Sequence, residues 1–248
     1  MISSINAELI FSSIVHVISY YFAININGII QSFVANKLGD DTAIRYGYNA
    51  FNPALYLNFL NTAFLLLFGL PVPVLVPVNL FNLSYSHRYL SLLLLYYAPC
   101  VINIILAILA LTLTMLVYNP SEVYMILSDL MQFRFISLSK VASHLHNTGF
   151  SIVILFLLLH FIYYNIFLAW YSAIAGSVKY IFTLITNSKE TYAHKYLFRY
   201  FDYIFIATQI MFAVLFGNKL IAIISTIVSL CANYIIIFIN FIKTLFNI

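Results

Sequence analysis

Residues 27–53 read NGIIQSFVANKLGDDTAIRYGYNAFNP, and this stretch carries the clearest signals in the chain. It begins inside an apolar run and leaves that run at Lys37. Four charged side chains then fall within nine positions, although only 7% of all residues are charged: Lys37, Asp40, Asp41 and Arg45. The pattern predicts a helix that ends in a polar loop at the face of a membrane.

The composition of the whole chain supports that interpretation. Of its 248 residues, 64% are hydrophobic and 18% aromatic, and the mean hydropathy is +1.01. A soluble domain is about half apolar and about a quarter charged. Several uncharged apolar runs reach the roughly 20 residues that a membrane-spanning helix needs. We therefore expect an all-α integral membrane protein, a polytopic bundle of about five or six transmembrane helices.

The apolar runs predict where the helices lie. We expect spans at residues 10–35, 89–118 and 150–183, a further helix that opens the apolar run after Pro53, and one or two more within residues 203–248. The stretch at 68–83 carries Pro71, Pro73 and Pro77, which no regular helix accommodates, so it predicts an extended or re-entrant segment. Residues 1–200 form the expected membrane core and residues 201–248 a C-terminal transmembrane part.

The loop at 37–53 resembles a motif of the site-2 protease family of intramembrane zinc metalloproteases. In that family a membrane helix carries H-E-x-x-H and continues roughly as A-x-K-L-G-D-x-T-A-x-R-x-G-x-x-x-x-N-P. The matching positions follow in the same order: Lys37, Leu38, Gly39, Asp40, Thr42, Ala43, Arg45, Gly47, Asn52 and Pro53.

Two later segments continue the resemblance. The family carries roughly P-V-P-V-N-x-x-N after the loop, and its end is matched here by Pro77, Val78, Asn79 and Asn82. The helix entry A-G-P-x-x-N is matched in part by Pro99 and Asn103. The family's N-P-x-x-H-x-D keeps its Asn and Pro, whereas Tyr56 and Asn58 replace the His and the Asp.

The positions at which the resemblance places the metal ligands have changed. Asn27, Gly28 and Gln31 stand where the family has His, Glu and His, and Ala175 stands where the family has the third ligand, an Asp. Carboxamides are poor zinc ligands and glycine supplies no general base. Because Asn27 and Gln31 are four residues apart, they share one helical face. We expect both to bond other helices and to face Asn52, Asn58 and the segment 71–79.

Other polar residues of the apolar runs have structural interpretations. His16 lies about three helical turns before Gln31, too far to replace a ligand of the motif, so we expect a buried, hydrogen-bonded histidine. Cys100 and Cys231 both lie in apolar runs, where we expect small residues that face lipid or the core rather than a disulfide or a metal pair.

These observations favour a catalytically inactive relative of site-2 proteases, without a cofactor, that binds transmembrane segments of other proteins in a lipid bilayer. Two alternatives stay open. One is a polytopic transporter or organellar respiratory subunit that shares only the loop, and the other is an active zinc protease that uses different ligands. The net charge of +4 is spread along the chain, so no nucleic-acid partner is expected. Abundant Ile, Tyr, Phe and Asn suggest an AT-rich genome, hence the inner membrane of an intracellular bacterium or an organellar membrane.

Overall fold

The computed structural model describes residues 2–56, 59–68, 71, 73, 76–80, 82–83, 88–131, 141, 143, 150–185, 207, 226–227, 229–241 and 244. Every regular element within these residues is helical. Three helices are long: α1 (Ile2–Lys37), α4 (Arg88–Val117) and α7 (Phe150–Ile185). The shorter ones are α2 (Thr42–Arg45), the 3-10 helix η1 (Pro53–Tyr56), α3 (Phe59–Phe68), α5 (Pro120–Met131) and a C-terminal helix at Ser229–Phe241.

The three long helices are apolar enough to cross a membrane. Their candidate spans are Glu8–Lys37, Tyr89–Val117 and Ile152–Ile181. These agree with the spans predicted at 10–35, 89–118 and 150–183. Five or six such helices were expected, and the described residues contain three. The helix after the polar loop, α3, has only ten residues, about half the length that a bilayer requires.

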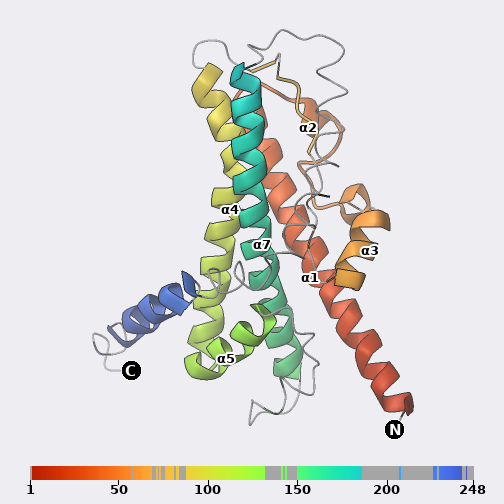
Figure 1. Ribbon diagram of the computed structural model, residues 1–248, viewed down its shortest axis with the longest axis vertical. Coiled ribbons are helices and arrows are strands. Elements are labelled where there is room, and N and C mark those ends of the chain that lie inside the picture. Colours follow the sequence, from red (N-terminus) through yellow and green to blue (C-terminus); the bar gives the residue numbers. More distant parts are fainter. Residues whose placement is uncertain are drawn as a thin grey trace.

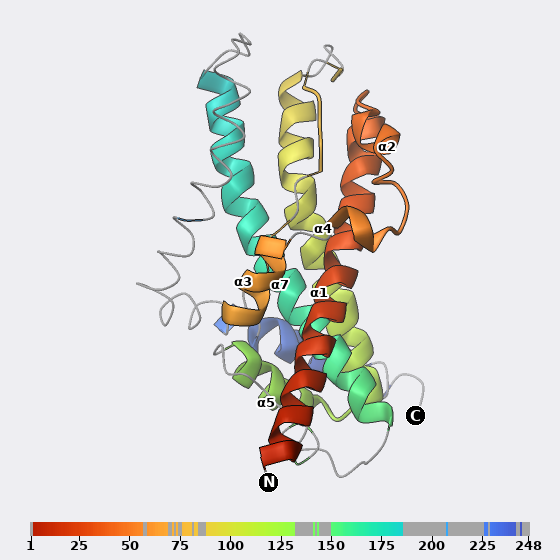
Figure 2. The same cartoon turned by 90° about the vertical axis from the view of Figure 1, so that its right-hand side faces the viewer.

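The long helices pack as a bundle (Figures 1 and 2). Helices α1 and α7 run upward in Figure 1 and α4 runs downward. In the upper half of Figure 2, α4 stands between α7 and α1. Ala35 of α1 packs there with Leu92 and Leu95 of α4. Lower down, α1 meets α7 directly, with Phe156 and Tyr164 among the fully buried side chains of the central core.

Helix α4 approaches α7 closely at a glycine. A Cβ added to Gly176 would lie 2.6 Å from the backbone carbonyl oxygen of Tyr96, so no larger residue fits without separating the helices. Two hydroxyl pairs bridge the same contact: Tyr97 with Ser177 at 2.7 Å and Tyr96 with Thr183 at 3.1 Å. The absent side chain at 176 thus permits a hydrogen-bonded helix pair.

The segment at 68–83 and the C-terminal region are described in part. Pro71, Pro73 and residues 76–79 are not helical, as predicted for an extended segment, and Pro71 is buried. The domain boundary expected at residue 200 lies outside the described residues. In the C-terminal region the structure describes the apolar helix Ser229–Phe241.

Candidate functional site

Gly28 lies against a buried tyrosine. It sits on α1 and faces the end of η1, where an added Cβ would meet the Tyr56 hydroxyl oxygen at 1.8 Å and its Cζ at 2.5 Å. Tyr56 is 1% exposed, and the ring of Tyr48 packs on it edge to face at 5.4 Å. The Tyr56 ring therefore occupies the space into which any side chain at position 28 would extend.

The Tyr56 hydroxyl lies in surroundings that disfavour its ionised form. It is buried and accepts or donates no hydrogen bond within the described part of the chain. Burial raises the pKa of Tyr56 further above its ordinary value, and the neighbouring Tyr48 adds to that rise. The phenol thus stays protonated at neutral pH and carries no negative charge that would attract a metal ion.

Among the residues that the structure describes, Asn27 and Gln31 bond to each other. The Gln31 amide nitrogen donates to the Asn27 side-chain oxygen at 3.1 Å. Bonds from this pair to other helices stay a prediction; among the described residues the amide that reaches the loop is that of Asn25. Its oxygen accepts the backbone N–H of Asn52 at 3.1 Å, and its nitrogen donates to the Tyr21 carbonyl at 2.8 Å. Asn58 lies outside the described residues.

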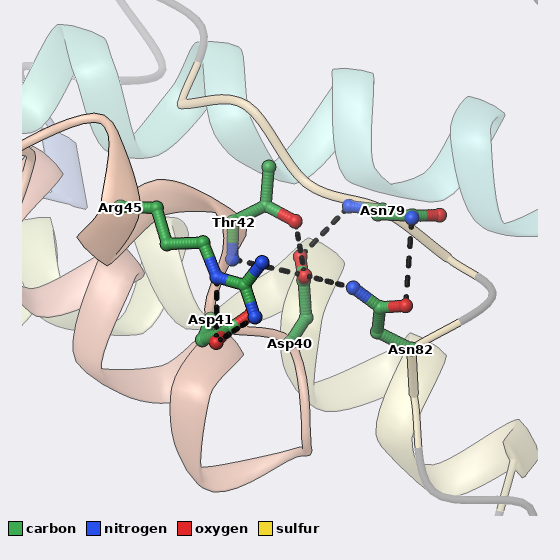
Figure 3. Close-up of polar contacts among 6 residues, drawn as sticks. All are labelled: Asp40, Asp41, Thr42, Arg45, Asn79 and Asn82. Carbon is green, nitrogen blue, oxygen red and sulfur yellow. Dashed lines mark hydrogen bonds and ion pairs between the residues drawn. The ribbon is translucent and has the colours of Figure 1, made fainter.

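The loop after α1 is fixed by one buried carboxylate, Asp40 (Figure 3). Asp40 is fully buried. It accepts from the backbone N–H and the hydroxyl of Thr42 at 3.1 and 2.5 Å. It also accepts from the backbone N–H of Asn79 at 2.7 Å and from the Asn82 amide at 3.1 Å. We call these four residues the Asp40 clamp.

The residues around Asp40 turn the chain into the clamp. Gly39 takes a left-handed φ of 104°, and the Asp40 N–H then bonds the Ala35 carbonyl at 2.9 Å, which ends α1 as a glycine cap does. Lys37 is the last residue of α1. Leu38 and Val78 both pack against a buried cluster that contains Leu83 of the proline-containing segment. The sequence analysis identified residues 37–40 and 77–82 as two separate motifs. In the fold these two segments are in contact.

The Asn52–Pro53 pair begins η1. The Asn52 side-chain oxygen accepts the Ala54 N–H at 3.1 Å, which caps the 3-10 turn. Pro53 is its first residue, where the missing N–H costs nothing. This local structure directs Tyr56 onto Gly28.

Ala175 is the fourth of the positions at which the resemblance places an active-site residue, and it lies where α7 contacts α4. Ala175 is buried, and its neighbours Gly176 and Ser177 contact Tyr96 and Tyr97 of α4. On α4, Pro99 lies inside the helix and is buried. Asn103 is fully buried, and neither of its amide atoms has a hydrogen-bond partner among the residues that the structure describes.

A second polar cluster lies where α1 meets α7. His16 is buried and its Nδ1 bonds the hydroxyl of Tyr164, which confirms the predicted buried, hydrogen-bonded histidine. His160 of α7 lies beside it, with the two ring centroids 3.9 Å apart. Our sequence analysis did not single out His160. The signal that could have identified it is an ionisable residue inside an apolar run. In a membrane protein such a residue is by default a candidate for a functional site.

Neither polar cluster assembles a conventional metal site. Across the described residues, no three His, Cys, Asp or Glu side chains come together. Cys100 and Cys231 are free and partly buried. Comparison of the chain with models of protein families, with curated proteins and with solved structures gives no match.

Proposed function

We propose that the chain is a membrane-embedded, catalytically inactive relative of site-2 proteases, which binds transmembrane segments of other proteins without cleaving them. The observation that carries the proposal is the Tyr56 ring lying on Gly28. By the resemblance, position 28 holds the general base in active relatives and position 56 holds a histidine. Here a glycine and a tyrosine fill the same volume with a neutral phenol.

The two replacements depend on each other physically. Tyr56 fits only because position 28 has no side chain, since its hydroxyl would lie 1.8 Å from a Cβ. The site-2 protease motifs place residues 28 and 56 in one catalytic cleft, and they are neighbours in this fold. That agreement supports a retained framework whose catalytic interior has been filled.

The Asp40 clamp supports the same framework. It bonds the K-L-G-D motif to the P-V-N-x-x-N motif across 39 positions of sequence between Asp40 and Asn79. An unrelated membrane protein that happened to share the loop would not be expected to keep the second motif as the partner of the first.

The proposed membrane location rests on three long apolar helices and their exposed apolar faces. On α4 the exposed side chains recur along one side of the helix and include Val101, Ile104, Ile105, Ile108, Leu109 and Leu113. Such faces suit lipid or a further transmembrane helix. The larger bundle of five or six helices expected from the sequence belongs to this proposal.

Binding without cleavage is testable with single-span peptides. The purified protein is reconstituted in nanodiscs with a labelled helical transmembrane peptide that contains a Gly or Asn near its centre. We expect the energy transfer between the peptide and the protein to saturate as peptide is added. The peptide should keep its full mass after prolonged incubation with zinc, because no base or metal ligand is available. A peptide of leucine only is the control, and it should give no saturation.

Two outcomes would contradict the proposal. Cleavage of the peptide within its apolar segment would show an active protease. Identical, non-saturating transfer for both peptides would show that the protein does not select transmembrane segments.

A further inference from the structure

The face of α1 that packs on α7 in the lower part of the bundle continues upward without α7. His16 bonds the hydroxyl of Tyr164 on α7, and the ring of Tyr20 lies 6.0 Å from that of Tyr164. Asn27 follows His16 by three helical turns and Gln31 follows Tyr20 by the same step, so both amides project in nearly the same direction as the residues that contact α7. In the upper half of the bundle, to which they belong, α4 stands between α1 and α7 (Figure 2). The two amides therefore lie on a face of α1 from which α7 has diverged.

Four residues make up this face, which we call the α1 stripe. Asn27, Ile30, Gln31 and Val34 recur at i, i+3, i+4 and i+7, the spacing of one helix-packing surface. Ile30, Gln31 and Val34 are each partly exposed. Phe33, which is 51% exposed, points nearly opposite to Gln31. The α1 stripe is thus a packing face that the described part of the chain covers incompletely, away from the most exposed side of the helix.

The amide pair leaves a donor and an acceptor unused on the α1 stripe. Gln31 Nε2 donates to Asn27 Oδ1 at 3.1 Å, which fixes the two side chains relative to each other. Among the described residues, Asn27 Nδ2 and Gln31 Oε1 have no hydrogen-bond partner, and neither atom is fully enclosed. Polar groups without a partner are costly inside a membrane. The stripe therefore favours a helix that brings a hydrogen-bonding group of its own.

A third carboxamide with unused capacity lies at the same level of the bundle. Asn103 of α4 is fully buried, and both of its amide atoms lack a partner in the described part of the chain. Leu92 of α4 shares a core cluster with Ala35 of α1. Asn103 follows Leu92 by three turns, and because α4 runs opposite to α1, the same step from Ala35 leads to about residue 24. Asn103 thus lies within about one turn of Asn27 along the bundle, so two helices favour a polar occupant here.

The free groups of the pair select a carboxamide. An Asn or Gln side chain offers both a C=O and an NH₂ group, so it can bond both members of the pair. A carboxylate only accepts and an ammonium only donates. Either would also bring a charge into a helix that has no charged residue between Glu8 and Lys37 to compensate it. Gln31 lies six residues before Lys37, the last residue of α1, which is about 9 Å along the helix.

We propose that Asn27 and Gln31 recognise transmembrane segments that carry an Asn or Gln side chain about 9 Å from one membrane face. The bound segment packs on the α1 stripe, where α1 and α7 diverge. Its carboxamide donates to Gln31 Oε1 and accepts from Asn27 Nδ2. This role rests on the proposed function and names the class of segment that the protein binds.

The test compares three labelled peptides with the native protein in nanodiscs, by the energy transfer between peptide and protein. Each peptide has an apolar segment of about 20 residues built from leucine. One carries Asn six residues from one end, one carries Gly at that position and one carries leucine throughout. The peptides are kept dilute enough that they do not associate with each other. We expect the Asn peptide to bind roughly 3-fold to 30-fold more tightly than the Gly peptide.

Two variants identify the groups that produce this preference. Gln31→Met keeps the length of the side chain but removes the amide, so it should lower the affinity for the Asn peptide to that for the Gly peptide. The control is Asn36→Leu, which removes an exposed amide near the end of α1 and should keep the preference. The two peptides and the two residues at position 31 form a double-mutant cycle, in which general damage to the fold would weaken both peptides alike.

The outcomes separate this inference from the proposed function. Equal, saturating binding of the Asn and Gly peptides would overturn the inference and leave the proposed function intact, whereas no saturation with any peptide would contradict both. Retention of the preference by Gln31→Met, or its loss in Asn36→Leu, would also overturn the inference. The comparison of peptides on the native chain needs no variant, so it decides the matter even if Gln31→Met does not fold.

Discussion

Replacement of Asp40 by alanine should lower the free energy of unfolding by roughly 3–5 kcal/mol. The carboxylate is fully buried and accepts four hydrogen bonds, from the backbone and hydroxyl of Thr42, from the Asn79 backbone and from the Asn82 side chain. Alanine would remove the one acceptor that holds these partly buried donors of two separate segments together. Thermal or chemical unfolding of the purified protein in detergent gives the measurement.

The adjacent Asp41 provides a matched control. Its carboxylate pairs with Arg45 at 2.6 Å, but the Asp41 side chain is 43% exposed and that of Arg45 is 76% exposed. Exposed pairs of this kind contribute about 0–1 kcal/mol, so Asp41→Ala should cost little. Asp40→Asn should fall between the two, since it keeps one acceptor oxygen. Equal effects of Asp40→Ala and Asp41→Ala would show that the clamp does not hold the loop.

Introducing glutamate at Gly28 should destabilise the protein by about 3 kcal/mol or more. The Cβ alone would overlap the Tyr56 hydroxyl at 1.8 Å, and the carboxylate would enter an apolar contact. Adding Tyr56→His, which restores the smaller residue of the family motif, should recover much of the loss. The same unfolding measurement on both single variants and the double variant gives the coupling energy.

The control for Gly28→Glu is a carboxylate on an open face of the same helix. Asn36 is exposed near the end of α1, and Asn36→Glu should change stability by only about 0.5 kcal/mol. Additive effects of Gly28→Glu and Tyr56→His, with no recovery in the double variant, would mean that these two residues do not share one space.

The sequence predicted the long helices well because their signal is local. The span predicted at 89–118 is α4 at Arg88–Val117, and the block predicted at 150–183 is α7 at Phe150–Ile185. A continuous apolar run fixes such a helix without reference to the rest of the fold. The run after Pro53 was also apolar, but α3 ends at Phe68, shortly before Pro71.

The sites were predicted only where the signal was local. Asp40 was singled out by its motif, yet nothing in the spacing predicted that its partners would be Asn79 and Asn82. Gly28 and Tyr56 were noted as two separate departures from the family pattern, and their dependence on each other is visible only in the packing. The bond from Asn52 to Asn25 rather than Asn27 depends on which face of α1 the loop meets.

The zinc content of the native chain tests the central claim most directly. The protein should be purified in the presence of zinc, washed free of loosely held ions and measured by mass spectrometry of the metal against protein concentration. The account predicts no stoichiometric zinc, because Asn27, Gly28, Gln31 and Ala175 supply no adequate donor set and Tyr56 fills the space beside Gly28. One tightly bound zinc per chain, lost when Asn27 and Gln31 are changed to alanine, would contradict it.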